Sequence, residues 1–490
     1  MKRFLVLACA VLAALTATTS AANSPLPNVL FIMADDFRPE LASYGSPAQT
    51  PNLTRLASRA MQFNRAYCQQ ALCNPSRSSM LTGRRPDSTG IWCNSIHFRE
   101  PSPNVTTLPL WFKEHGYTTR CVGKIFHNWH TEVKGDPRSW SDPEFLHYAN
   151  HNEDKPQVTG EVPSDLATSP KCECRDVPDE ALYDGRVAAE AVRVLSEVKD
   201  QPFFLAVGFW KPHSPFNAPL RYWDQYDRAK LPVLNPNRAV GAPEVAHHDG
   251  REIRGVPPNQ LTFTPEQAAE IRHGYFANIA FMDAQIGKVL DALEKSGALD
   301  RTIVVFASDH GYHVGEHSLW GKTSNFELDA RVPLLIATPN LPDTNPKRER
   351  GTRVGRTTES LAELVDLFPT LVDLCGLPKP PGLEGVSLAP VLRNPAAVVK
   401  QGAFTQHPRP MYYDREPSKT PESMGVSVRT SLVRYTEWRD WKSSQTIARE
   451  LYASLTDPAE MKNEIDSPAL AAAQHLAETL LAKQFPRVKH

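Results

Sequence analysis

The sequence has no excess of charge of either sign. Its 54 lysines and arginines balance 55 aspartates and glutamates, so the formal net charge is −1 at pH 7. A chain without a positive excess has no global attraction for nucleic acid. The one short basic stretch, Lys347 to Arg353, follows two prolines and is interpreted as a solvated loop. We therefore expect no nucleic-acid partner, and any affinity for an anion must come from individually placed cations.

Apolar runs long enough to cross a bilayer, about 20 residues, are also missing. Lys2 and Arg3 precede a shorter run, Phe4 to Leu15, which small residues follow. This order is typical of a secretory signal peptide, and Cys9 stands too early in it for a lipoprotein site. We expect residues 1–22 to be a signal peptide, no transmembrane segment, and a soluble mature protein that is exported to the periplasm or secreted.

Internal repeats and low-complexity tracts are absent, and glycine (25) is scarcer than proline (43), which favours ordered loops stiffened by proline. The chain of 490 residues exceeds the roughly 250–300 residues at which a single hydrophobic core stops growing. We therefore expect a large domain over residues 23–398 and a smaller C-terminal subdomain over residues 399–490.

Cysteines are few enough to be placed one by one. Of the eight, Cys9 lies in the expected signal peptide and Cys73 belongs to a motif described below. Cys172 and Cys174 are too closely spaced for the usual zinc knuckle with two intervening residues, so a loop disulfide and free thiols both stay open. The pairing of the remaining cysteines cannot be deduced from sequence. They are Cys68, Cys93, Cys121 and Cys375.

Three apolar runs share one design: each is rich in valine, isoleucine, phenylalanine or similar residues, and ionisable residues follow each. Such continuous runs indicate strands buried on both faces, as in a parallel sheet. Ligands bind beyond the carboxyl ends of such strands, so the ionisable side chains are predicted to meet in one site. The runs are Asn28–Ala34, followed by Asp35 and Asp36; Phe203–Phe209, followed by Lys211 and His213; and Thr302–Ala307, followed by Asp309 and His310.

Helical patterns separate the predicted strands. Apolar residues recur every three or four positions from Ile271 to Leu293, after a capping box over Thr264 to Gln267. Gly297 is placed to end this helix, and a second helix is predicted over about 178–198. Strands that alternate with helices predict an α/β fold.

Beyond about Leu392 the pattern changes to short, partly alternating strands. We predict strands at 403–406, 424–433 and 450–454 and a helix over 468–485. These elements would form a small α+β subdomain with an antiparallel sheet, packed on the large domain.

Two groups of residues carry chemistry. Asp35, Asp36 and Asp309 supply hard oxygen ligands that suit Ca²⁺ or Mg²⁺, while His310 is compatible with these ions and would also suit zinc. The alternative for the adjacent aspartates is that they cap a turn. The second group is Cys73-Asn74-Pro75-Ser76-Arg77, in which the cysteine is either a modified nucleophile or part of a proline-containing turn before a helix.

This second group resembles the cysteine motif of the type I sulfatases, and further segments appear in the order seen in that family. They are Met33–Asp36, Cys73–Arg77, Leu81–Gly83, Gly123-Lys124 and Ser308–Gly311. A finer resemblance is to the iduronate-2-sulfatase branch, in which two residues also separate the lysine and histidine seen here as Lys124 and His127. The finer match rests on Asp35–Pro39, Gly123–His127, Lys211–His213, Gly315–His317, Trp320–Phe326 and Tyr412–Trp441.

The resemblance implies an alkaline-phosphatase-like fold with a mostly parallel central sheet between helices. It implies a sulfuric ester hydrolase that removes O-sulfate from a sulfated carbohydrate, expected to be a polysaccharide that contains uronic acid or its oligosaccharides. It further implies that a maturation enzyme converts Cys73 to formylglycine, whose hydrated aldehyde attacks sulfur. The implied metal ion is Ca²⁺, in preference to Mg²⁺. Its implied ligands are Asp35, Asp36, Cys73, Asp309 and His310.

The same resemblance assigns roles to other side chains. Arg77 would hold the formylglycine, Lys124 and Lys322 would neutralise sulfate oxygens, His213 would protonate the leaving alcohol, and His127 would remove a proton to expel sulfate. Lys124, His213, Lys322 and Tyr312 are expected to contact substrate. Tyr312 and Trp320 either form a wall for sugar stacking or belong to the core, and His313 and His317 are expected to be structural or to line the pocket.

Two other functions compete with this one. A phosphoester or phosphonate hydrolase on the same fold would release phosphate and no sulfate. A secreted glycan-binding relative without activity would need neither Cys73 nor paired metal carboxylates, so the intact set of residues argues against it.

Overall fold

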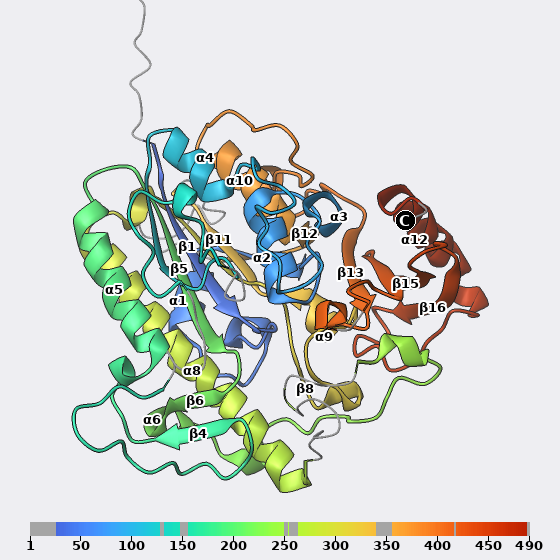
Figure 1. Ribbon diagram of the computed structural model, residues 1–490, viewed down its shortest axis with the longest axis horizontal. Coiled ribbons are helices and arrows are strands. Elements are labelled where there is room, and N and C mark those ends of the chain that lie inside the picture. The colour runs from blue at the N-terminus through green and yellow to red at the C-terminus, as the bar shows by residue number, and fades with distance from the viewer. Residues whose placement is uncertain are drawn as a thin grey trace, which may run out of the picture.

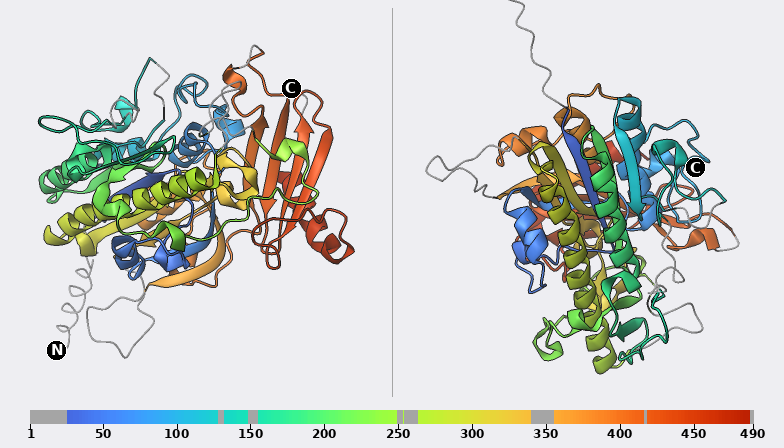
Figure 2. Two further views of the ribbon diagram at one scale, coloured as in Figure 1. Left: turned by 90° about the horizontal axis from the view of Figure 1, so that it is seen from below. Right: turned by 90° about the vertical axis from the view of Figure 1, so that its left-hand side faces the viewer.

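The computed structural model describes residues 26–127, 132–147, 155–248, 253, 263–339, 355–415 and 418–487, so the predicted signal peptide lies outside the described residues. A central sheet lies between helices, and a smaller antiparallel sheet stands at one side of this layered body (Figure 1). Figure 2 shows the small sheet beside the large one in the left-hand view. The predicted α/β fold class is confirmed.

The central sheet has eight strands, and the three predicted apolar runs form its middle. The strand order is β10-β2-β11-β7-β1-β5-β3, with β12 paired to β2. β1 (Asn28–Asp35) lies between β5 (Phe203–Pro212) and β7 (Thr302–Ser308) and is parallel to both. β10 and β11 run antiparallel to β2. The other strands are β2 (Met61–Tyr67), β3 (Thr118–Gly123), β10 (Arg331–Val332), β11 (Leu334–Ala337) and β12 (Arg356–Glu363).

Helices cover both faces of this sheet because successive strand residues point to opposite sides and both sides are apolar. Leu30 and Ile32 of β1 pack toward α1, α5 and α8, whereas Phe31 and Met33 pack toward α2, α4 and α10. These helices are α1 (Pro51–Ala57), α2 (Cys73–Thr82), α4 (Leu108–Glu114), α5 (Tyr183–Val198), α8 (Pro265–Lys295) and α10 (Leu367–Leu374). Shorter elements are α3 (Pro86–Thr89), α6 (Leu220–Trp223), α9 (Glu327–Ala330), α11 (Ala389–Arg393), β4 (Cys172–Arg175), β6 (Phe216–Pro219), β8 (His313–Val314) and β9 (Trp320–Gly321).

Both predicted helices are present. The capping box of α8 is confirmed, since Thr264 Oγ1 accepts from the Gln267 amide and Gln267 Oε1 accepts from the Thr264 amide. α5 begins at Tyr183 instead of near 178, because Leu182 is extended. The Asp184 carboxylate, in the first turn of α5, accepts hydrogen bonds from the backbone N–H groups of Trp210 and Lys211 near the end of β5, at 2.8 and 3.0 Å.

The small sheet is antiparallel, in the order β13-β14-β15-β16, and α12 packs against it. The single strand predicted over 424–433 is wrong: the segment is a hairpin. Thr430 Oγ1 accepts the backbone N–H groups of Leu432 and Val433, which closes a tight turn that the strand-forming residues did not signal. The elements are β13 (Ala403–Arg409), β14 (Ser423–Arg429), β15 (Val433–Asp440), β16 (Thr446–Ala453) and α12 (Ala471–Gln484).

The cysteines in the described part of the chain are all free thiols, Cys172 and Cys174 included, which settles the alternative left open by their spacing. Across the same described residues, no helix combines the length and the apolar character that a membrane crossing requires.

Candidate active site

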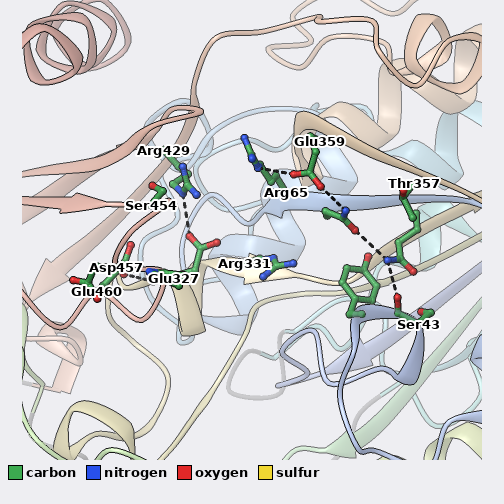
Figure 3. Close-up of a pocket in the computed structure, with 14 residues that line it drawn as sticks. Ser43, Arg65, Glu327, Arg331, Thr357, Glu359, Arg429, Ser454, Asp457 and Glu460 are labelled. Atoms are coloured by element: carbon green, nitrogen blue, oxygen red, sulfur yellow. Dashed lines mark hydrogen bonds and ion pairs between the residues drawn. The ribbon is translucent and has the colours of Figure 1, made fainter. Parts of the chain in front are cut away.

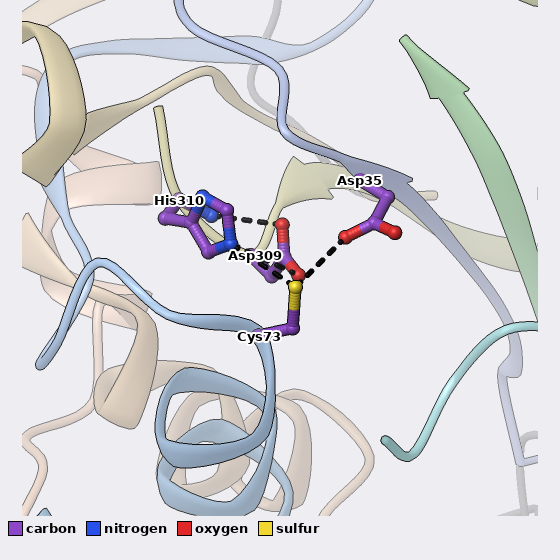
Figure 4. Close-up of side chains that lie close together, drawn as sticks. All are labelled: Asp35, Cys73, Asp309 and His310. Carbon is purple, nitrogen blue, oxygen red and sulfur yellow. Dashed lines mark hydrogen bonds and ion pairs between the residues drawn. The ribbon is translucent and has the colours of Figure 1, made fainter. Parts of the chain in front are cut away.

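Cys73 lies at the first residue of α2, where the extended Leu72 turns the chain into the helix. Its thiol is buried, with Sγ 3.5 Å from Asp35 Oδ1 and 3.4 Å from His310 Nε2 (Figure 4). Burial, with the Asp35 carboxylate beside it, raises the pKa of this thiol to about 12. An unmodified Cys73 is therefore a protonated thiol at neutral pH, which is a poor nucleophile.

The carboxylates come from the ends of neighbouring parallel strands, as the sequence predicts. Asp35 is the last residue of β1, and Asp309 follows the last residue of β7. Asp36 has a φ of +63°, a left-handed conformation that turns the chain away from the strand direction. Its backbone N–H donates to Asp309 Oδ1 at 3.2 Å, which ties the two strand ends together. All three carboxylates are fully buried.

The donor set fits a hard divalent cation. Ligand atoms of Asp35, Cys73, Asp309 and His310 lie within 4.8 Å of one another, and His310 Nε2 is also 3.4 Å from an oxygen of Asp36. Carboxylate oxygens dominate this set, and buried carboxylates in contact need cations to be stable. The residues predicted as metal ligands are thus brought together, and the simple turn-capping interpretation of the two aspartates does not account for this convergence.

Arg77 is the fully buried counter-charge of this cluster. Its Nε donates to Asp309 Oδ2 at 2.8 Å, and Nη2 lies 3.3 Å from Asp35 Oδ1. Nη1 donates to the carbonyl oxygens of Lys124 and Ile125 at 2.6 and 3.0 Å. One guanidinium therefore joins α2 to the ends of β1, β3 and β7, which fixes Cys73 relative to the carboxylates.

Two lysines complete the charge balance. The Lys124 ammonium forms an ion pair with Asp35, and Lys322 Nζ lies 2.7 and 2.9 Å from the two oxygens of Asp36. Burial disfavours the charge of Lys124, but Asp35, Cys73 and Asp309 together outweigh this effect and raise its pKa. Burial likewise opposes ionisation of Asp35, yet Lys124 and Arg77 hold its pKa well below the usual range. The site thus keeps both signs of charge at neutral pH.

The two predicted histidines flank this cluster and are neutral. Burial and the nearby Lys124 lower the pKa of His127, whereas burial and Lys322 lower that of His213. Neither ring nitrogen of His127 has a hydrogen-bond partner among the described residues. His213 Nδ1 lies 2.6 Å from the Ser214 carbonyl oxygen, and its Nε2 lies 3.8 Å from Asp36 Oδ2. Both imidazoles are thus within reach of the charged groups.

The aromatic ring of Tyr312 is not exposed to the active site. Its side chain has no exposed surface and stacks on Tyr275 at a centroid distance of 5.8 Å, while Trp320 is 5% exposed. A ring enclosed on both faces has no room for a sugar, so the structure favours the core alternative for these two residues. His313 and His317 are structural: His313 Nδ1 is 2.6 Å from Asp329 Oδ1, and its Nε2 is 3.1 Å from His317 Nδ1.

The sequence reasoning missed the residues that hold the loop of Lys322. Asp329 accepts from the backbone and the hydroxyl of Ser324 at 2.9 and 2.6 Å. From the small sheet, Arg409 Nη1 donates to the Thr323 carbonyl at 2.9 Å, and the Gly425 carbonyl accepts from the Asn325 amide at 3.1 Å. No motif or periodicity marks Arg409 and Gly425 as partners, because they lie far from this loop in the chain.

Gly208 allows β5 to approach the end of β3 closely. A Cβ at this position would lie 1.9 Å from the Lys124 carbonyl oxygen, so only glycine allows β5 to approach the end of β3 so closely. That approach lets the Lys124 amide donate to the Gly208 carbonyl at 2.9 Å, which positions Lys124. A glycine inside an apolar strand indicates such a close contact.

Comparison with known proteins agrees with this geometry. The model of the sulfatase family matches residues 27–377, and that of the N-sulphoglucosamine sulphohydrolase C-terminal region matches residues 315–485. Iduronate 2-sulfatase of Mus musculus is 35% identical over 506 residues, which cover 89% of this chain and 90% of that protein. Iduronate 2-sulfatase of Homo sapiens is 34% identical over 505 residues, with the same shares.

Solved structures share the fold over almost the whole chain. BT4656, in complex with its substrate D-glucosamine-2-N,6-O-disulfate, has a TM-score of 0.72 at 22% identity and covers 94% of this chain and 97% of its own. The phosphonate monoester hydrolase of Silicibacter pomeroyi has a TM-score of 0.73 at 21% identity and covers 95% and 96%. The topology of the chain and its likeness to these structures define the class of proteins with the alkaline-phosphatase-like fold. Within that class, the chain belongs to the sulfatase family, in the branch of the iduronate 2-sulfatases, and is a sulfuric ester hydrolase.

Proposed function

We propose that this protein removes O-sulfate groups from a sulfated saccharide that contains uronic acid, with Cys73 matured to formylglycine. The observation that carries the proposal is the convergence of Cys73, three carboxylates, His310 and two lysines in one buried cluster, with the partly buried His213 beside it. The similarity to iduronate 2-sulfatases over 89% of the chain supports the substrate class. We also propose export of the protein, a maturation enzyme as its partner, and a division into a catalytic domain over 23–398 and a subdomain over 399–490.

The donors available for a divalent cation are Asp35, Asp36, Asp309, His310 and the residue at position 73. Oxygen-rich sets of this kind favour Ca²⁺, which we propose as the resident ion. When bound, such an ion withdraws electron density from sulfate oxygens and favours the ionised form of a hydroxyl. Formylglycine at position 73 would supply that hydroxyl, which the buried, protonated thiol does not.

The lysines bind the sulfate group in this proposal. Lys124 and Lys322 come from distant parts of the sequence. Both are already shielded from water, with 4% and 3% of their surface exposed, respectively. A desolvated ammonium interacts strongly with an anion because little water screens it. Both therefore stabilise the negative charge that spreads over the sulfate oxygens as the ester bond breaks. Arg77 fixes the position of the nucleophilic residue relative to Asp309.

The histidines move protons in this proposal. His127 is neutral and both its nitrogens are without partners among the described residues, so a nitrogen is available for a proton. Burial and Lys124 lower its pKa, and a sulfate group that neutralises Lys124 would make His127 a stronger base. His213 has to deliver a proton to the leaving sugar oxygen. Lys322 is one cause of its low pKa, and a bound sulfate ester would neutralise this cation and raise that pKa. Burial is the main cause of the low pKa of His213, so substrate binding removes one of its causes and shifts this histidine toward the protonated form that the reaction needs.

Mass spectrometry and a sulfate-release assay test the proposal together. Trypsin cuts after Arg65 and Arg77, so one peptide, 66–77, carries both Cys68 and Cys73. We expect a loss of about 18 Da located on Cys73, the difference between a thiol and an aldehyde, together with sulfate release from sulfated disaccharides. Cys73→Ala should lose more than roughly 99% of this turnover. Cys68→Ala is the matched control, since Cys68 contributes no atom to the cluster, and it should stay active.

Two results would overturn the proposal. Full turnover by Cys73→Ala would show that the residue at position 73 is not the nucleophile. A modified Cys73 that releases phosphate from phosphonate esters, and no sulfate from any sulfated sugar, would assign the site to the competing hydrolase.

A further inference from the structure

A chain of hydrogen bonds runs behind the loop that carries Lys322. His313 Nδ1 lies 2.6 Å from Asp329 Oδ1, and His313 Nε2 lies 3.1 Å from His317 Nδ1. His317 Nε2 in turn lies 2.9 Å from the Ala459 carbonyl oxygen. None of the three side chains exposes more than 1% of its surface, so they depend on one another for hydrogen bonds.

The carbonyl end of this chain fixes the protons on the two rings. A backbone carbonyl only accepts, so His317 Nε2 carries a proton and donates it to Ala459. Burial and the neighbouring His313 lower the pKa of His317 to about 4, so this ring is neutral at neutral pH and its Nδ1 is an acceptor. His313 Nε2 is therefore the donor between the two rings and carries a proton.

The contact between His313 and Asp329 holds a second proton. A separation of 2.6 Å between a ring nitrogen and a carboxylate oxygen requires one proton between them. The carboxyl group is the stronger acid by roughly 2–3 pKa units, so that proton resides on His313 Nδ1. Burial opposes ionisation of Asp329, but His313, with His248 and Ser324, outweighs this effect and lowers its pKa. With protons on both nitrogens, His313 is an imidazolium.

The other charged groups around His313 leave Asp329 as its counter-ion. Glu316, on the neighbouring turn, is paired with Arg38 at 2.6 Å. His248 is neutral, because burial holds its pKa well below the usual range. Among the described residues, Asp329 alone forms an ion pair with His313. A buried charge is stable when it is both paired and hydrogen-bonded, as this one is.

This pair holds Lys322 from both sides along the chain. His313 on β8 is paired with Gly321 on β9, the residue before Lys322. Asp329 accepts from the backbone and the hydroxyl of Ser324, two residues after Lys322. The pair thus fixes both flanks of the residue whose ammonium reaches the active-site cluster.

Thr323, between these flanks, shows why the loop needs such anchors. Its φ is +90°, a left-handed conformation that is strained for a β-branched residue. Strained conformations persist only where the surrounding contacts enforce them. Without its anchors the loop would relax, and Lys322 would lose its position beside Asp36.

The helix that carries Asp329 is itself fixed at its first residue. α9 begins at Glu327, whose carboxylate lies 3.3 Å from Arg429 and 2.5 Å from Arg434, both on the small sheet. The Glu327 amide donates to Glu460 at 2.6 Å. Figure 3 shows Glu327 joined to Arg429 at a polar cavity between the central and the small sheet. Asp329 is therefore a firm anchor for the loop.

We propose that His313 is a buried imidazolium whose hydrogen-bonded pair with Asp329 positions Lys322 for the sulfate group. The positioning role rests on the function proposed above for Lys322, whereas the protonation of His313 does not. His313 acts only through the loop, so it is a positioning residue for the reaction.

Nitrogen NMR of the full chain, labelled with ¹⁵N-histidine, tests the protonation state, because protonated and unprotonated ring nitrogens differ clearly in chemical shift. We expect a histidine with both nitrogens protonated at neutral pH, and Asp329→Asn assigns it. An asparagine can donate to His313 and still accept from Ser324, so His313 should become neutral in this variant with every hydrogen bond kept. If no doubly protonated histidine responds to Asp329→Asn, the proposal is overturned.

Sulfate release then tests the positioning role. His313→Gln leaves Asp329 buried without its counter-ion and should lower kcat/KM for sulfated disaccharides at least about 30-fold. Asp329→Asn alone should stay within about fivefold of the unsubstituted enzyme. Adding Asp329→Asn to His313→Gln removes the unpaired charge and should recover at least about tenfold. A ring that only fills space predicts no recovery, since a second substitution in the same core adds damage.

His273→Gln is the matched control. His273 is also buried and hydrogen-bonded, with Nε2 2.9 Å from the Trp223 carbonyl oxygen, but it lies on α8 and packs against Trp223 and Tyr226. Its kcat/KM should stay within about twofold of that of the unsubstituted enzyme.

Two kinetic outcomes would overturn the positioning role. One is a His313→Gln variant that Asp329→Asn does not rescue, and the other is a loss in His273→Gln as large as that in His313→Gln. The NMR measurement needs only the unsubstituted chain and Asp329→Asn, so it decides the protonation state even where His313→Gln does not fold. No sulfate release from the unsubstituted enzyme with formylglycine at position 73 would refute the proposed function and leave the NMR result standing.

Discussion

Replacing Arg77 by alanine should destabilise the folded protein by about 3–5 kcal/mol, the usual cost of removing one partner from a buried ion pair. The side chain is fully buried and contacts two carboxylates, those of Asp309 at 2.8 Å and Asp35 at 3.3 Å. Its loss leaves these like charges together with one cation fewer. It also leaves the carbonyl groups of Lys124 and Ile125 without a donor.

Urea unfolding followed by circular dichroism measures this loss. Arg55→Ala is the matched control, because Arg55 also forms a short ion pair, 2.6 Å from Asp291, but both side chains are more than 40% exposed. Exposed pairs contribute about 0–1 kcal/mol, so the two arginine variants should differ by at least about 2 kcal/mol. Equal unfolding free energies for Arg77→Ala and Arg55→Ala would refute the reasoning, since burial would then add nothing to the pair.

Arg77→Lys separates charge from geometry. The lysine keeps the positive charge but replaces a planar fork that donates in several directions by a single ammonium. Stability should fall by only about 1–2 kcal/mol, because the counter-charge remains and the lost hydrogen bonds are individually modest. Sulfate release should still fall at least about 10²-fold, because the hydrogen bonds that fix α2 to the strand ends are lost. Unchanged turnover in Arg77→Lys would show that charge alone suffices.

Three further predictions concern the metal, pH and the sulfate-binding cations. Removal of divalent metal with EDTA should lower the melting temperature, and Ca²⁺ at about 100 times its Kd should restore about 2.7 kcal/mol; an unchanged melting temperature would contradict the metal site. Burial and the neighbouring His313 lower the pKa of His317 from 6.5 to about 4, so the unfolded chain binds more protons in this window and stability should fall by up to about 3 kcal/mol as the pH drops from 6.5 to 4. In His317→Gln, the free energy of unfolding measured across this range should depend less on pH. An unchanged pH dependence would assign the effect to other groups. Lys322→Ala should lower kcat/KM for sulfated disaccharides at least about 10²-fold, whereas Lys295→Ala, at the end of α8, should leave it within twofold; equal rates in both variants would remove Lys322 from the site.

The strands and the ligand cluster were predictable because their signals are local. An unbroken run such as Asn28–Ala34, short and rich in strand-forming residues, favours a buried strand, and the ionisable groups that follow such strands gather at one edge of a parallel sheet. The roles expected for Lys124 and Lys322 came from resemblance alone, since a single lysine has no diagnostic pattern. Tyr312 illustrates the limit: whether a ring faces solvent depends on what covers it, here Tyr275 from the distant α8.

The turn at Thr430 is local and was hidden by the strand-forming residues around it. Arg409 and Gly425, the distant partners of the Lys322 loop, escaped prediction for another reason. Each depends on hydrogen bonds whose acceptors or donors are set by tertiary packing, as with Arg409 and the Thr323 carbonyl. A sequence pattern records which faces are apolar, but it does not record which distant carbonyl a buried guanidinium will meet.

The contacts that hold the loop of Lys322 also bear on the order in which parts of the active site become available during synthesis of the chain. A chain made from its N-terminus contains Asp35, Cys73 and Lys124 early, whereas Arg409 and Gly425, which secure this loop, emerge near the end of synthesis. The unfinished enzyme can therefore gather its carboxylates and still lack a fixed second cation for sulfate. The position observed for the Lys322 loop therefore requires residues of the C-terminal sheet, which are among the last to be synthesised.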